Sequence, residues 1–183
     1  MGSQYAVGRK ETKVCKNGGG GLPYGRYTNN WKFIDHTKGN GSGFALILDF
    51  QTQSNTYISA WAQTVDVYPS QEYHFSAWFA KYGSVTAPNL RFRVVSYDAN
   101  NNVIANSNKV VGNAAPTKAF IYDQFSGTYN TPPNAVKCKL FIECKPRNST
   151  TNAGDDFFID DISFINGCEN IKSQIAYTID FAS

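Results

Sequence analysis

The stretch Tyr73-His-Phe-Ser-Ala-Trp-Phe79 decides the fold class, because every second residue from Tyr73 to Phe79 is apolar. Side chains of a β-strand point to opposite faces in turn, so these four apolar residues share one face. The opposite face carries His74, Ser76 and Trp78. We therefore predict a strand whose first face lies in a core and whose second face is the outer side of a sheet.

Further strand-like runs extend on both sides of this stretch, separated by segments rich in Pro, Asn, Asp, Ser and Gly. Their spacing is typical of a sandwich or barrel, not of alternating strands and helices. No segment has a sustained apolar period of 3.6 residues, so we expect almost no helix. The predicted strands are Gly43–Asp49, Tyr57–Val67, Glu72–Ala80, Leu90–Tyr97, Phe125–Tyr129, Val136–Cys144 and Asp156–Phe164.

The length and composition favour one domain with a partner-contacting surface. A chain of 183 residues can bury a substantial core, and we place one domain at residues 14–166, between a tag or linker at 1–13 and a tail or linker at 167–183. Aromatic residues reach 15%, which suits strands and a ligand-contacting face. The net charge of +3 is small and scattered, which argues against nucleic acid. No apolar run is long enough to predict membrane insertion.

The four cysteines do not have the spacing of a zinc site. Cys138 and Cys144 lie six residues apart in one predicted strand, about 20 Å along it, which is too far for a disulfide. We expect both to be buried free thiols. Cys15 and Cys168 flank the patterned region, and two possibilities stay open for them: a disulfide between the two ends of the sandwich, or two further thiols.

The order of several short motifs resembles a known group, the jelly-roll, galactose-binding-like domains. This group includes the family 4/9 carbohydrate-binding modules and the MAM adhesion domains, although the MAM disulfide pattern is not evident here. The resemblance implies an all-β jelly-roll sandwich of two antiparallel sheets. It covers roughly Trp31 to Phe164 and is carried by Asp35–Gly41, Trp61–Pro69, Tyr73–Trp78, Phe125–Tyr129 and Asp156–Phe164.

The resemblance also implies a structural calcium ion between the loop after the first strand and the last strand. Calcium takes six to eight hard oxygen ligands. Alternatively, the loop aspartate caps a turn and the last strand ends in water. Adjacent aspartates in a strand point to opposite faces, so we expect at most one of Asp160 and Asp161 to be a ligand. His36 is expected to pack or to hydrogen-bond. The candidate residues are Asp35, Lys38, Asn40, Gly43, Asp160 and Asp161.

Alternation predicts a candidate ligand face that combines aromatic and charged side chains, if the strands concerned are neighbours. Aromatic rings stack on sugar C–H groups, while polar groups bind hydroxyls or, through arginine, an acidic sugar. Alternatively, a loop covers Trp78 and the arginines pair with Glu143. A second candidate site lies at a loop edge with Tyr27, Trp31 and Tyr129, and Trp61 is assigned to the core. The candidate face comprises Trp78, Tyr82, Arg91, Arg93, Tyr97, Gln124, Phe141 and Glu143.

We find no pattern of residues that predicts catalysis. The paired acids of jelly-roll hydrolases, spaced Glu-x-Asp-x-Glu on one strand, are missing. The leading hypothesis is a non-catalytic carbohydrate-binding module that binds polysaccharide. It would be a monomeric unit of a larger extracellular or cell-surface protein, from a bacterium. The alternative is a cell-surface adhesion or spacer domain that contacts protein.

Overall fold

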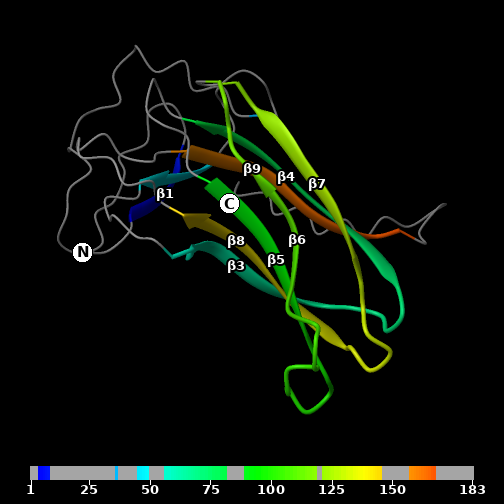
Figure 1. Ribbon diagram of the computed structural model, residues 1–183. Helices are drawn as coiled ribbons and strands as arrows, with labels where there is room; N and C mark the ends of the chain where they lie inside the picture. The colour runs from blue at the N-terminus through cyan, green and yellow to red at the C-terminus, as the bar shows by residue number, and fades with distance from the viewer. Residues whose placement is uncertain are drawn as a thin grey trace.

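The computed structural model describes residues 4–8, 36, 45–49, 56–81, 89–118, 121–145 and 157–167. The regular elements among these residues are all strands (Figure 1), and these residues contain no helix that could span a membrane. The strands are β1 (Gln4–Gly8), β2 (Ala45–Asp49), β3 (Ile58–Asp66), β4 (Glu72–Lys81), β5 (Asn89–Tyr97), β6 (Lys109–Ala114), β7 (Asp123–Asn130), β8 (Lys137–Lys145) and β9 (Phe157–Asn166).

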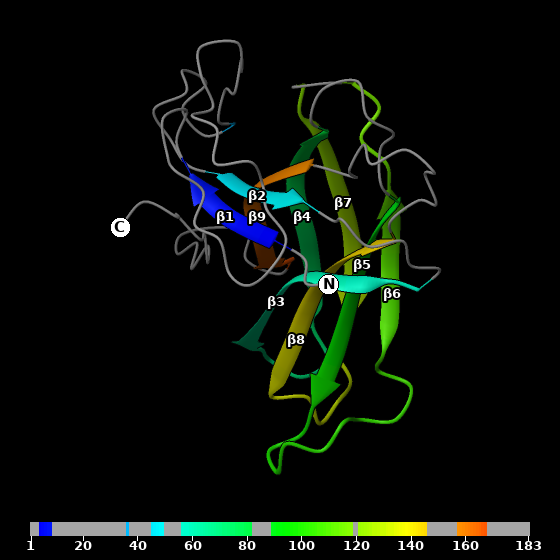
Figure 2. The ribbon, with the colours of Figure 1, turned by 90° about the vertical axis from the view of Figure 1, so that its left-hand side faces the viewer.

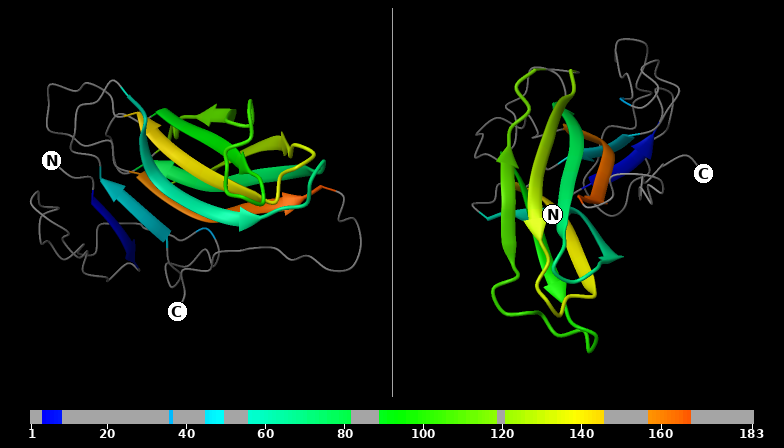
Figure 3. Two further views of the ribbon diagram at one scale, coloured as in Figure 1. Left: turned by 90° about the horizontal axis from the view of Figure 1, so that it is seen from below. Right: turned by 90° about the vertical axis from the view of Figure 1, so that its right-hand side faces the viewer.

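The strands form two antiparallel sheets that face each other. Sheet A has the order β1-β2-β9-β4-β7, and sheet B has the order β3-β8-β5-β6. The chain changes sheet after β2, β3, β4, β6, β7 and β8. Figure 2 shows the strands of both sheets, and the view from below in Figure 3 shows sheet B as one layer over sheet A. The predicted all-β jelly-roll sandwich is confirmed.

Apolar side chains from both inner faces fill the space between the sheets. Phe92 of β5 stacks on Phe125 of β7, with ring centroids 3.6 Å apart and an interplanar angle of 6°. Phe75 of β4 meets both rings edge to face. The four residues of the Tyr73–Phe79 stretch that alternation directs inward, Tyr73, Phe75, Ala77 and Phe79, are all buried. This aromatic cluster joins sheet A to sheet B.

The seven predicted strands are confirmed as β2 to β5 and β7 to β9, with ends that differ by at most two residues. Two strands are additional. β1 lies in the segment predicted to be unpatterned and pairs with β2. β6 was missed because a bulge opposite Phe92 and Arg93 interrupts its alternation. Its Gly112 faces Phe125, whose ring leaves no space for a Cβ at that position.

A second bulge, in β9, changes which residues share a face. Ser163 pairs with Ser76 and Asp160 pairs with Trp78, so two residues of β9 oppose one residue of β4. The first of these two, Asp161, has a φ of 46° in the left-handed region. The bulge interrupts strict alternation along the last strand.

The predicted state of the two strand cysteines is confirmed: Cys138 and Cys144 are buried free thiols on the inner face of β8. Burial raises the pKa of the Cys138 thiol to about 11, and a hydrogen bond with Ser96 only partly offsets this effect. Cys15 and Cys168 lie outside the described residues.

Candidate functional site

The candidate ligand residues are divided between the two sheets, so the prediction that they share one face is wrong. Trp78 lies in β4 of sheet A, where it pairs with Gln124 of β7. Arg91, Arg93 and Tyr97 of β5 and Phe141 and Glu143 of β8 lie in sheet B. Alternation identifies the outer side of each strand, but it cannot tell which sheet a strand joins. Tyr82 lies outside the described residues.

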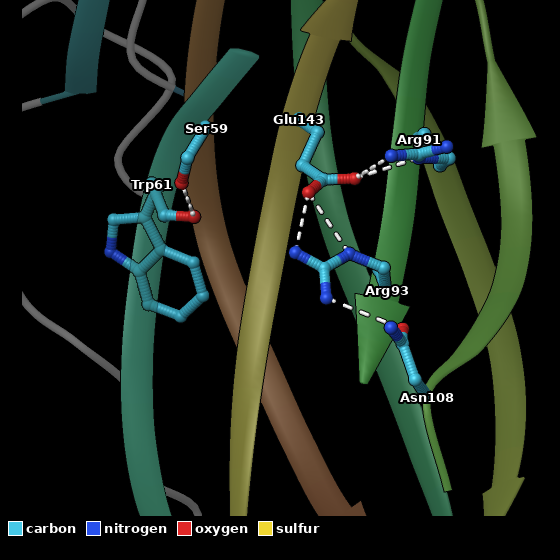
Figure 4. Close-up of polar contacts among 6 residues, drawn as sticks. All are labelled: Ser59, Trp61, Arg91, Arg93, Asn108 and Glu143. Atoms are coloured by element: carbon cyan, nitrogen blue, oxygen red, sulfur yellow. Dashed lines mark hydrogen bonds and ion pairs between the residues drawn. The ribbon is translucent and has the colours of Figure 1, made fainter. Parts of the chain in front are cut away.

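The outer face of sheet B is organised around the carboxylate of Glu143. Arg91 binds the Oε2 atom through Nε at 2.7 Å and Nη2 at 2.6 Å. Arg93 binds the Oε1 atom through Nε at 2.9 Å and Nη2 at 2.6 Å. Figure 4 shows Glu143 reaching from β8 towards both arginines on β5. Each oxygen of one carboxylate is thus held by a different guanidinium group.

Each of the two arginines also stacks on an aromatic ring. The Cζ atom of Arg91 lies 3.9 Å from the ring centroid of Tyr57, just before β3. The Cζ atom of Arg93 lies 3.8 Å from the ring centroid of Phe141. Guanidinium groups at such distances are attracted by the negative face of the ring. Stacking and ion pairing together fix both arginine side chains.

The two arginines keep Glu143 ionised although its side chain is only 6% exposed. Burial opposes the charged form, but hydrogen bonds and the positive charges of Arg93 and Arg91 outweigh it, and the pKa of Glu143 is lowered. One carboxylate cannot neutralise two guanidinium groups. The cluster therefore carries a net positive charge at neutral pH.

The arginines differ in how many of their donors are used. The Nη1 atom of Arg93 donates to Oδ1 of Asn108 at 3.3 Å, so all three nitrogens of this guanidinium have a partner. Arg91 uses Nε and Nη2 on Glu143, and its Nη1 group has no hydrogen bond to a residue in the described part of the chain. Arg91 is also the more exposed side chain, at 28% against 19%. It is the donor best placed to contact a ligand.

The neighbouring residues of β5 and β8 extend this face. Phe141 pairs with Arg93, and Lys139 pairs with Val95. Lys139 is 5.2 Å from the Phe141 ring centroid. Tyr97 pairs with Lys137 at the end of the face towards the β5–β6 turn. The face joins the charged cluster to a row of lysines on β8.

On sheet A, Trp78 is stacked with a residue from a loop. The rings of His36 and Trp78 have centroids 3.8 Å apart and an interplanar angle of 18°. Tyr122 meets the same imidazole edge to face at 5.6 Å. This arrangement agrees with the alternative in which a loop covers Trp78, and His36 packs and hydrogen-bonds as predicted. One face of the indole is therefore occupied within the protein.

The two aspartates of β9 lie beside this stacked pair. The backbone N–H of His36 donates to Oδ2 of Asp160 at 2.9 Å, and its Nδ1 lies 2.6 Å from Oδ2 of Asp161. The prediction that adjacent aspartates diverge is therefore wrong, because the β9 bulge lets both reach His36. Asp35, Lys38, Asn40 and Gly43 lie outside the described residues.

Sequence reasoning missed two residues of the sheet B face and misplaced one residue elsewhere. Tyr57 was missed because a bulge in β3, between Ser59 and Trp61, shifts the alternation beyond it. Asn108 belongs to the segment leading into β6, which was not predicted. Trp61 packs against the core as expected. Tyr129 is no loop-edge residue, because it is buried and hydrogen-bonded to Ser96 and Ser107.

Comparisons with known proteins find similarity in structure only. No protein-family model matches the sequence, and no curated protein is significantly similar to it. The CBM22-1 and GH10 modules of Clostridium thermocellum endo-1,4-β-D-xylanase 10B, complexed with xylohexaose, match with a TM-score of 0.50 and 15% identity. The match covers 74% of this chain and 23% of that chain, so the present chain spans less than a quarter of that protein.

Two smaller solved domains show a weaker similarity. The CBM22-1 xylan-binding domain of Paenibacillus barcinonensis Xyn10C has a TM-score of 0.45 and 16% identity, over 67% of this chain and 72% of that one. A CBM4 structure has a TM-score of 0.45 and 12% identity, over 67% and 70% of the two chains. At these identities the likeness concerns the jelly-roll fold.

Proposed function

We propose that the chain is a non-catalytic carbohydrate-binding module and that the outer face of sheet B binds polysaccharide. The observation that carries the proposal is the fixed cluster of Arg91, Arg93 and Glu143 between the rings of Tyr57 and Phe141. Polar groups held in place before binding lose little entropy when a sugar arrives. Aromatic side chains beside them provide apolar surface for sugar C–H groups.

The chemistry of the same cluster supports binding without catalysis. A glycosidase needs one carboxyl group whose pKa is raised so that it can donate a proton. Glu143 has the opposite property, since two arginines lower its pKa. Both of its oxygens accept hydrogen bonds within the protein. We therefore assign Glu143 to positioning the arginines.

We further propose that this module works outside the cell, as a monomeric unit of a larger protein. The jelly-roll fold supports this part of the proposal, because the CBM22-1 module with the same fold is a part of a longer chain. The alternative function, an adhesion domain that contacts protein, draws on the same cluster, because arginine and aromatic residues are also enriched in protein interfaces.

A structural calcium ion remains part of the proposal. The described residues contain no group of three or more acidic, histidine or cysteine side chains that could hold a metal. The contacts of His36 with Asp160 and Asp161 support the proposal, because they bring the residue that follows Asp35 in the sequence to β9. Two carboxylates on one side supply hard oxygen ligands of the kind that calcium prefers.

A glycan array followed by titration calorimetry tests the carbohydrate function. We expect Tyr57→Ala to weaken binding of the best glycan at least tenfold, because it releases Arg91 and removes ring surface. Tyr68→Ala is the matched control, since this tyrosine is 68% exposed on the β3–β4 turn. Equal binding by both variants would remove the site from sheet B. A folded protein that binds no glycan would favour the adhesion function.

A further inference from the structure

We propose that the polysaccharide bound by sheet B is acidic, carrying carboxylate or sulfate groups, and that Arg91 makes the principal contact with its anionic groups. This inference rests on the proposed carbohydrate function and specifies its ligand class. Three properties of the outer face carry it: its net charge, the use of its aromatic rings, and the free donors of Arg91.

Among the residues that the structure describes, positive charge is concentrated on this face. Its outward charged residues have a formal net charge of +3. The other described residues include three lysines and six acidic residues, a formal net charge of −3. Within the described part of the chain, this face is therefore the one that attracts a polyanion. The outward charged residues are Asp66, Arg91, Arg93, Lys137, Lys139, Glu143 and Lys145.

The aromatic rings of this face are used to hold cations. Arg91 and Arg93 lie over the rings of Tyr57 and Phe141 at distances of less than 4 Å. A neutral sugar binds by stacking its C–H groups on an open ring face. Here one face of each ring holds a guanidinium group instead. The rings thus stabilise the positive charges that an anionic sugar would contact, and they offer less surface to a neutral sugar.

Arg91 keeps more N–H donors for a ligand than Arg93 does, because Arg91 uses two of its five donors within the described part of the chain and Arg93 uses three. Glu143 and Asn108 together engage all three nitrogens of Arg93. The Nη1 group of Arg91 makes no hydrogen bond to a described residue, and the side chain is held in position by Tyr57 and Glu143. A guanidinium group with its N–H donors fixed in one plane suits the two oxygens of a carboxylate or sulfate group. Arg93 serves as a positioning residue.

The lysines on the outward side of β8 form a row that is long enough to contact several sugar units of a polysaccharide. Lys137, Lys139 and Lys145 all lie on the outward side of β8. An antiparallel strand rises by about 3.4 Å per residue, so the row from Lys137 to Lys145 is about 27 Å long. Such a length exceeds one monosaccharide several times over. An acidic polysaccharide along β8 would meet Arg91 near one end and Lys139 towards the other.

Affinity electrophoresis and calorimetry with matched glycan pairs test the inference. The probes are polygalacturonate against its methyl ester, and dextran sulfate against dextran. Within at least one pair, we expect the anionic member to bind at least tenfold more tightly, and the pair that discriminates identifies carboxylate or sulfate as the recognised group. Raising sodium chloride from 50 to 200 mM should weaken this binding several-fold.

Variants assign the effect to the residues of the face. Arg91→Gln should weaken binding of the anionic glycan about tenfold or more, as expected for a lost charge-assisted hydrogen bond. Lys139→Gln removes a positive charge that does not contact Glu143, and it should weaken binding of the anionic glycan about threefold. This second variant keeps the test valid if Arg91→Gln is unstable. Lys118→Gln makes the same charge change on an exposed lysine outside this face and should leave binding unchanged.

The possible failures can be told apart. Equal affinity for the charged and neutral members of both pairs overturns the inference and leaves the carbohydrate function standing. Binding of neutral glycans alone has the same consequence. If no glycan is bound by the folded protein, the proposed function and this inference fail together. Binding of a single-stranded DNA oligonucleotide as tightly as polygalacturonate would also overturn the inference, because the face would then select charge without selecting sugar.

Discussion

At the scale of single residues, the role of a charged side chain depends more on its contacts than on which amino acid it is. Glu143 is an acidic side chain on a sheet face, where a hydrolase would place a catalytic acid. Its contacts with Arg91 and Arg93 make it a permanent anion that holds two cations. Glu143 therefore contributes to stability and to the shape of the ligand face, and this contribution depends on pH.

Glu143→Gln should destabilise the domain by about 2–3 kcal/mol at pH 7, because two partly buried arginines lose their counter-charge. The native pKa of Glu143 is lowered, so its stabilising effect is complete above the pKa of an unfolded glutamate, about 4.3. It is lost as the pH falls through the lower native pKa. Urea unfolding of the wild-type protein and of Glu143→Gln measures the difference in their free energy of unfolding. We expect this difference to be smaller at pH 3 than at pH 7.

Glu72→Gln is the matched control, because Glu72 is exposed and should give little difference at either pH. If Glu143→Gln lowers the free energy of unfolding by the same amount at pH 3 as at pH 7, the loss of stability arises from packing and not from charge.

Trp78 tests the assignment of the sheet A face. Trp78→Ala removes the ring that stacks on His36 and should cost about 2–4 kcal/mol, in the lower part of the range for aromatic residues because the indole is half-buried. Thermal and urea denaturation measure the loss. Gln124→Ala, at the exposed position paired with Trp78, should change stability by less than about 0.5 kcal/mol. An equally stable Trp78→Ala protein that no longer binds glycan would return the ligand site to sheet A.

At the scale of elements, three bulges determine which side chains the strands place on each face of the sheets. The bulge in β3 changes the alternation beyond Ser59, the bulge in β6 brings Gly112 against the aromatic core, and the bulge in β9 lets both aspartates reach His36. Each inserts one residue that strict alternation does not anticipate. The ligand face and the sheet A loop contacts both depend on such insertions.

Gly112 shows how closely β6 packs on the opposite sheet. Gly112→Ala would place a Cβ against the ring of Phe125, which is buried and stacked on Phe92. We expect a loss of about 1–3 kcal/mol, since the ring has little room to move. Asn113→Ala, at the exposed neighbouring position, should have a much smaller effect. Urea unfolding compares the two, and equal losses would show that the close packing at Gly112 is unimportant.

At the scale of the whole molecule, the outer faces of the two sheets carry different arrangements of side chains. On sheet A, His36 stacks on one face of the Trp78 indole and contacts β9. On sheet B, charged and aromatic side chains are held in place and partly exposed. A sandwich buries its inner faces between the sheets, so each outer face is available for a separate purpose. Under the proposed function, ligand binding belongs to the outer face of sheet B.

If a calcium ion holds the loop on sheet A, it stabilises the folded protein by binding only that state. We expect the melting temperature to rise with calcium, relative to protein in excess chelator, and to rise much less with magnesium. Asp160→Asn should remove most of this response. Coinciding melting curves with calcium and with chelator would refute the structural metal.

Sequence reasoning alone predicts the fold class, seven of the strands and the inward residues of β4, because alternation of apolar residues is a local property of each strand. It also predicts that Cys138 and Cys144 are buried thiols and that the arginines and Glu143 point outward. The three-dimensional structure is needed to find that Trp78 and the arginines lie on opposite sides of the sandwich, that Tyr57 joins the cluster, and that Asp160 and Asp161 meet one histidine. The physical reason is that sheet membership depends on pairing between distant strands, and bulges shift the facing of residues by one position without an evident local pattern.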